Sequence, residues 1–112
     1  MVLVEFESPN CGFVQKTSND LISNVRKGLT QISDWKIWMD NNRNDFIRNN
    51  FGKINSEIPT SRIYYCLVVS RRELMDEKAQ SIRSQKMYES KNLKIITYDR
   101  LADYITELRY GY

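Results

Sequence analysis

Residues 62–70 read RIYYCLVVS and form the strongest strand signal of the chain. β-Branched and aromatic side chains favour strands, and an unbroken apolar run is typical of a strand that is buried on both faces. We therefore predict a central or parallel strand here. Apolar segments at residues 2–6 (VLVEF) and 93–98 (LKIITY) predict two further strands.

Segments with helical patterns alternate with these strands. Residues 17–41 begin with Thr17 and Asp20, spaced as in a capping box. Their apolar residues then recur at helical spacing: Leu21, Val25, Leu29, Ile32 and Met39. A short second helix is expected within residues 41–58, ended by Pro59, and another helix at residues 73–88. A last helix follows Asp99, which we expect to cap it.

This alternation predicts an α/β fold in which helices flank a mixed, mainly parallel sheet with right-handed crossovers. The chain has 112 residues, 41% of them hydrophobic, which suits one domain with a core over residues 1–112. No apolar run approaches the roughly 20 residues of a spanning helix, and no signal peptide is evident. We therefore expect a cytoplasmic protein that does not contact membranes.

Residue counts restrict the chemistry. There is no histidine, which excludes Ser-His-Asp and Cys-His catalysis and His-ligated metal sites within this chain. The two cysteines, Cys11 and Cys66, cannot form a four-cysteine zinc site, and we expect Cys66 in the core. The net charge of +3 permits contact with a polyanion without arguing for it. Any catalysis by this chain would have to use carboxylates, amides, lysines or bound hard cations.

Two carboxylates stand at the end of the first strand. Glu5 and Glu7 point to the same face because side chains alternate along a strand. Two residues of a strand span about 7 Å, so the two carboxylates are expected at about that separation. A divalent cation such as Mg²⁺ or Mn²⁺ would relieve their repulsion, because hard cations prefer oxygen ligands. The alternative is a solvated strand edge without a ligand.

Basic, amide and aromatic residues supply a candidate nucleic-acid surface. Lys27, Gln31 and Trp35 share one flank of the first helix, where they could face a phosphate backbone. The alternative is a boundary face whose tryptophans pack under a loop. Lys16 and the pair Arg71-Arg72 are further candidate DNA contacts, with surface exposure and ion pairing as their alternatives.

Several of these segments resemble a known family. VEFESP at residues 4–9 and LTQISDW at 29–35 are similar to the C-terminal nuclease-like domain of Shedu anti-phage defence proteins, in the PD-(D/E)xK nuclease superfamily. So are the central strand and LKIITYDRL at 93–101, so that the resemblance spans nearly the whole chain. It implies a nuclease-like sheet with flanking helices and Mg²⁺-dependent cleavage of DNA phosphodiesters.

The resemblance also assigns roles to residues. It implies that Glu5 is the metal-binding acid, that Glu7 occupies the usual lysine position next to the metal, and that Gln31 is the glutamine of the following helix. Lys27 is the candidate for a lysine that has moved to the helix. The family's first acid lies on an earlier strand that has no counterpart here. We therefore expect a core that lacks its N-terminal part, or a homo-oligomer or partner chain that completes the sheet.

Three functions stay open at this point. The first is a metal-dependent DNA endonuclease-type domain in anti-phage defence, truncated or degenerate, with cleavage by this chain alone undecided. The second is a catalytically inactive module of the same fold that binds DNA or a protein and assembles a larger complex. The third is a small regulatory α/β domain that does not bind nucleic acid.

Overall fold

The computed structural model describes residues 1–51 and 62–110. Its three strands are β1 (Val2–Phe6), β2 (Tyr64–Val68) and β3 (Leu93–Ile96). The helices are α1 (Ser23–Phe51), α2 (Glu77–Glu89), α3 (Tyr98–Tyr110) and the 3₁₀ helix η3 (Arg72–Leu74). The strands form one sheet in the order β1-β2-β3, with both pairings parallel, so the predicted α/β fold with a mainly parallel sheet is confirmed.

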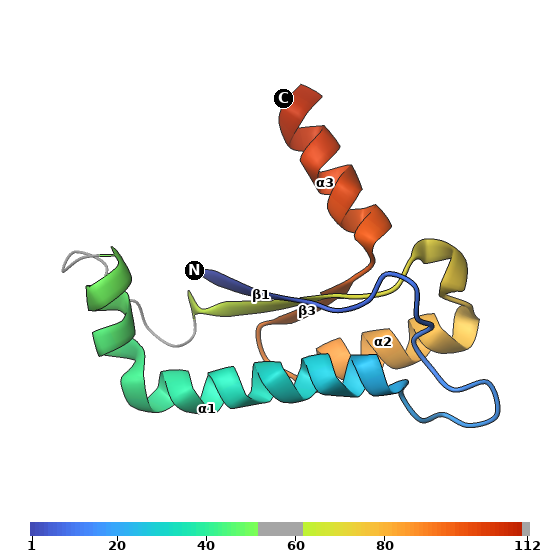
Figure 1. The fold of residues 1–112 in the computed structure, drawn as a ribbon, viewed down its shortest axis with the longest axis horizontal. Helices are drawn as coiled ribbons and strands as arrows, with labels where there is room; N and C mark the ends of the chain where they lie inside the picture. The colour runs from blue at the N-terminus through green and yellow to red at the C-terminus, as the bar shows by residue number, and fades with distance from the viewer. Residues whose placement is uncertain (52–61, 111–112) are drawn as a thin grey trace.

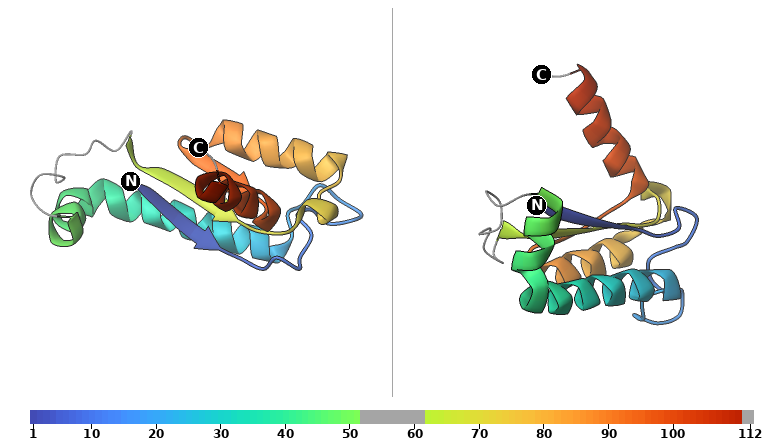
Figure 2. Two further views of the ribbon diagram at one scale, coloured as in Figure 1. Left: turned by 90° about the horizontal axis from the view of Figure 1, so that it is seen from above. Right: turned by 60° about the vertical axis from the view of Figure 1, so that its left-hand side comes forward.

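The helices cover the two faces of the sheet unequally. Two parallel crossovers of one hand that step across a sheet in the same direction leave both connecting helices on one face. Figure 1 shows this arrangement, with α1 and α2 together on one face. Figures 1 and 2 show that, of the described helices, α3 alone lies on the other face, where it projects away from the strands. None of the described helices is both long and apolar enough to cross a membrane.

The core lies between the sheet and the pair α1 and α2. Leu67 of β2 and Ile95 of β3 point into it and are almost completely buried. They meet Val25 and Ile32 of α1 and Ala79 of α2 in one cluster of buried residues. The apolar spacing in the sequence therefore marked the inner faces of these elements correctly.

Gly28 sets how closely α1 approaches the strands. A Cβ atom at this position would lie 2.5 Å from Cδ1 of Leu67 and 3.1 Å from Cγ of Glu7. Any larger residue here would force the Leu67 side chain to shift, because its Cβ would lie closer than van der Waals contact allows. The contact brings the N-terminal half of α1 against the carboxyl ends of β1 and β2.

Ser70 joins the loops at the carboxyl ends of the strands. Its N–H donates to the Ser8 carbonyl (2.9 Å), and its own carbonyl accepts from the Tyr98 N–H (3.1 Å). Ser70 is fully buried and has a φ of 66°, a left-handed conformation that is uncommon for a serine. The segments that follow β1, β2 and β3 are thereby held side by side.

The sheet face away from α1 is largely open. Val2, Val4 and Phe6 of β1 and Tyr64 of β2 point to this side, and Phe6 is 57% exposed. Cys66 is only half-buried between them, so its expected place in the closed core is wrong. The reason is the strand order, which leaves α3 as the only described helix on this face.

Three expected helix boundaries are also wrong. Thr17 and Asp20 lie in a loop closed by an antiparallel bridge between Val14 and Leu21, and α1 begins only at Ser23. Up to Phe51, the asparagine-rich segment continues α1 instead of forming a second helix. Residues 52–61, including Pro59, lie outside the described residues. The segment expected as one helix from residue 73 is divided into η3 and α2.

The cap of the last helix differs as well. The Thr97 hydroxyl accepts from the Arg100 N–H (3.2 Å), whereas Asp99 accepts from the backbone N–H of Arg72. The hydroxyl of Thr97 stands one residue before α3, in the position from which a side chain can bind the first free N–H groups of a helix. Asp99 lies inside the first turn of α3 and accepts from the first residue of η3 instead.

Substitution of Gly28 tests the close contact. Alanine normally stabilises a helix interior by about 0.5–1 kcal/mol relative to glycine. In Gly28→Ala we expect a net loss of about 1–3 kcal/mol in the free energy of unfolding, because the new Cβ overpacks the buried Leu67. Urea unfolding measures it. Ser33→Ala, at an exposed position of α1, is the control and should be neutral or slightly stabilising; a gain in Gly28→Ala would contradict the packing.

Candidate functional site

Glu5 and Glu7 lie together at the carboxyl end of β1, on the face that α1 covers. Glu5 is half-buried, and the side chain of Glu7 runs beside Gly28. Burial raises the pKa of Glu5, and the charge of Glu7 and a hydrogen bond with its side chain raise it further, while the charge of Lys27 lowers it. The two carboxyl groups are thus close enough to share a proton, and a cation between them would replace that proton.

The contacts of α1 place Lys27 and Gln31 relative to this pair. Gly28 lies against Glu7, whereas Trp35 lines a small cavity with Leu3, so α1 runs antiparallel to β1. Gln31 lies between these two contacts along the helix, at the level of Glu5 on the strand. It is exposed, and it shares a flank of the helix with Lys27 because the two are four residues apart.

The predicted DNA contacts differ in their surroundings. Trp35 is half-buried and packs against the core, which is the packing role left open from the sequence. Lys16 is exposed in the loop before α1. Arg71 pairs with Glu73 at 3.5 Å, and Arg72 pairs with Asp103 at 2.7 Å. A DNA contact by any of these residues stays a prediction, and for the two arginines it would compete with an ion pair.

Two neighbours of Glu7 had not been singled out from the sequence as site residues. The Tyr98 hydroxyl donates to the Glu7 carbonyl, and its ring packs against Phe6 with the centroids 6.4 Å apart. Burial, then the charges of Glu7 and Cys11, raises the pKa of Tyr98. Burial also raises the pKa of the Cys11 thiol, which donates to the Ser8 carbonyl. The position of Tyr98 at the carboxyl end of the expected strand 93–98 was the available signal, because the carboxyl ends of parallel strands meet at one edge.

The carboxylates at this site determine which cation it could hold. Among residues 1–51 and 62–110, no group of three or more histidine, cysteine, aspartate or glutamate side chains could hold a metal ion. Glu5 and Glu7 therefore form a two-carboxylate set. That set fits Mg²⁺, which commonly binds one or two carboxylates and completes its octahedron with water and substrate phosphate.

Comparison with known families decides what kind of domain this is. The family model described as the C-terminal part of Shedu protein SduA matches residues 1–102. The chain belongs to this family. The match covers all three strands and ends within α3. No curated protein matches the chain.

Membership in the Shedu C-terminal family confirms the resemblance found in the sequence and points to anti-phage defence. The match contains the VEFESP segment and the helix that carries Lys27 and Gln31. Placement in the PD-(D/E)xK superfamily, a nuclease-like fold, metal dependence and DNA cleavage all stay predictions.

The raised pKa of Glu5 makes a prediction about stability. In the unfolded chain Glu5 has the ordinary glutamate pKa of 4.5, whereas in the folded chain its pKa is higher. Between these two pKa values the folded chain holds the proton more tightly, so the free energy of unfolding falls as the pH rises through this interval. Glu5→Gln removes this titration. Without divalent ions, we expect the variant to gain stability relative to the wild type between pH 4 and pH 7.

Chemical denaturation across this pH range measures the difference. Glu107→Gln, which removes one carboxylate from an exposed position of α3, is the control for the loss of a charge. If the free energy of unfolding of Glu5→Gln falls relative to that of the wild type as the pH rises, Glu5 is stabilised as a carboxylate, contrary to the geometry described.

Proposed function

We propose that this Shedu C-terminal domain is a metal-dependent DNA endonuclease-type domain in anti-phage defence, with Glu5 and Glu7 as ligands of Mg²⁺ or Mn²⁺. The observation that carries the proposal is the convergence of the two carboxylates beside Lys27. The position of Gln31 at the level of Glu5 supports it, and so does the family match over residues 1–102.

Each side chain has a task that follows from its place. A bound divalent cation stabilises negative charge on a phosphate and lowers the pKa of an attacking water. Glu5 and Glu7 would hold that cation, and its binding would displace the proton that burial and the charge of Glu7 favour on Glu5. Lys27 supplies a positive charge beside them for the phosphate. The Gln31 amide, one turn further along α1, can orient the water or a phosphate oxygen.

Glu7 makes the electrostatics of this site unusual for an anionic substrate. A lysine at this position would attract the phosphate, whereas a carboxylate repels it unless a cation lies between them. The affinity of the site for DNA should therefore depend more strongly on the divalent ion than on the positive charge of Lys27. This dependence distinguishes the proposal from simple attraction of DNA to a basic surface.

One observation favours a second function, an inactive module that binds a protein or DNA and assembles a larger complex. Val2 and Phe6 of β1 and Tyr64 of β2 expose large apolar side chains on the sheet face opposite α1. Parallel sheets are normally covered on both faces. A second copy or a partner chain that covers this face would give the domain an assembly role without cleavage.

Nicking of supercoiled plasmid DNA tests the endonuclease proposal. We expect cleavage with Mg²⁺ or Mn²⁺ and none with EDTA, and a loss of at least about 100-fold in Glu5→Gln, because a metal ligand is removed. Gln31→Ala should lower the rate while leaving the melting temperature nearly unchanged, since Gln31 is exposed. Glu107→Gln is the matched control and should cleave like the wild type.

Two results would contradict the endonuclease proposal. The first is cleavage that persists in EDTA or in Glu5→Gln, which would place the activity elsewhere or in a contaminant. The second is the absence of cleavage together with salt-sensitive DNA binding, which would favour the assembly module, because phosphate contacts weaken as counterions are added.

A further inference from the structure

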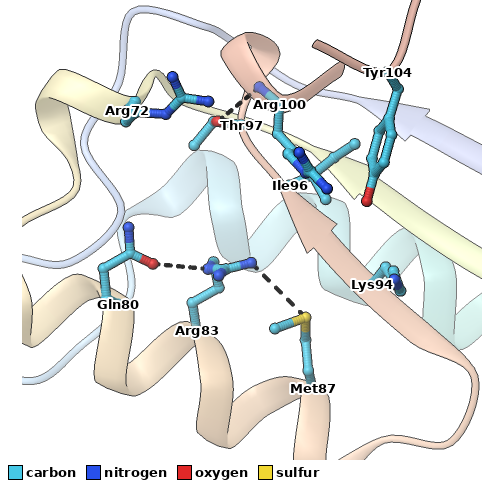
Figure 3. A pocket seen from close by; sticks show the side chains of 9 residues that line it. All are labelled: Arg72, Gln80, Arg83, Met87, Lys94, Ile96, Thr97, Arg100 and Tyr104. Carbon is cyan, nitrogen blue, oxygen red and sulfur yellow. Dashed lines mark hydrogen bonds between the residues drawn. The ribbon is translucent and has the colours of Figure 1, made fainter. Parts of the chain in front are cut away.

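A second concave site lies at the opposite edge of the sheet from Glu5 and Glu7. It is a pocket of about 360 Å³ formed by α2, β3 and the first turns of α3. Figure 3 shows side chains from these three elements around it. Because β1 and β3 are the outer strands in the order β1-β2-β3, the central strand separates this pocket from the carboxylate pair.

Arg83 of α2 is fixed in the pocket by uncharged partners. Its Nε donates to Oε1 of Gln80 at 3.1 Å, and its Nη1 donates to the carbonyl of Ile95 at 2.5 Å. The side chain is half-buried. These contacts orient the guanidinium group without neutralising it, so its positive charge acts on whatever enters the pocket.

Two further cations line the same pocket. Lys94 comes from β3 and Arg100 from α3. None of the ion pairs between described residues involves Arg83, Lys94 or Arg100, and no carboxylate is among the described residues that line the pocket. Arg72 also reaches the pocket, but Asp103 pairs with it. Three unneutralised cations thus meet in a chain whose net charge is only +3.

The remaining wall suits a flat or apolar group. The Tyr104 ring lines the pocket, with the Arg100 guanidinium 4.1 Å from its centroid, and Ile96 lies beside them. An aromatic ring with an arginine on its face is a surface on which nucleobases stack. The volume is at the lower end of the range for small-molecule sites and is too small for the backbone of a duplex along its length.

We propose that this pocket binds a phosphate monoester attached to a nucleoside. Arg83, Lys94 and Arg100 bind the phosphate, and Tyr104 contacts the base or sugar. Arginine donors match phosphate oxygens in pairs, and a dianion gains most from three cations in a concave site. The monoester can belong to a free nucleotide or to the phosphorylated end of a DNA strand. The proposal does not rest on the nuclease activity.

Isothermal titration with AMP and adenosine in EDTA tests the first source. We expect AMP to bind more tightly than adenosine. We also expect Lys94→Gln and Arg100→Gln each to lower the affinity for AMP at least about fivefold, because each variant removes a charge-assisted contact. Lys91→Gln, an exposed lysine that does not line the pocket, is the matched control. Arg83→Gln is a further variant whose melting temperature must be checked, because Arg83 also binds the β3 backbone.

Short DNA duplexes with a 5′-phosphate or a 5′-hydroxyl test the second source by fluorescence anisotropy. Tighter binding of the phosphorylated end, lost in Lys94→Gln and kept in Lys91→Gln, identifies the strand end as a ligand. The proposal is overturned if AMP binds no better than adenosine and the two duplexes bind equally. It is also overturned if Lys94→Gln and Arg100→Gln bind both phosphates like the wild type.

Discussion

The contact between Gly28 of α1 and Leu67 of β2 is the constraint on which the arrangement of the molecule depends. A Cβ at residue 28 would meet Leu67 at 2.5 Å, so the helix axis approaches the sheet more closely than side-chain packing would otherwise allow. Val25 and Ile32 enter the core on either side of this point. The same approach sets Glu7 against the helix and Lys27 within electrostatic reach of Glu5. Packing and the candidate chemistry are therefore consequences of one helix position.

The parallel sheet separates two regions of opposite charge. Glu5 and Glu7 lie at the β1 edge, where burial and mutual repulsion make the carboxylate form of Glu5 costly. Arg83 and Lys94 lie at the β3 edge, in a pocket without a carboxylate among its described lining residues. Each region holds an excess of one charge that a ligand of the opposite charge would neutralise. A cation suits the first and a phosphate suits the second.

The elements with one dominant apolar pattern could be predicted from the sequence. The apolar run at residues 62–70 contains β2, and the alternation of strands and helices predicted the parallel sheet correctly. The helix boundaries were harder, because Thr17 and Asp99 are both suitable caps by residue type. In the folded chain Thr17 lies in the loop before α1, and Thr97 caps α3 in place of Asp99. Cys66 was misplaced because an apolar run does not show that α3 is the one described helix on that sheet face and projects away from the strands.

For the candidate site, strand alternation predicted that Glu5 and Glu7 share a face, and helical spacing predicted that Lys27 and Gln31 do. The pocket lined by Arg83, Lys94 and Arg100 was not predicted, because these cations come from three elements and converge only in the folded chain. The most direct test of the central claim is an amide NMR titration with Mg²⁺. The account predicts shifts for Glu5, Glu7, Lys27 and Gln31 that are absent in Glu5→Gln. Shifts confined to other residues, or retained in Glu5→Gln, would contradict it.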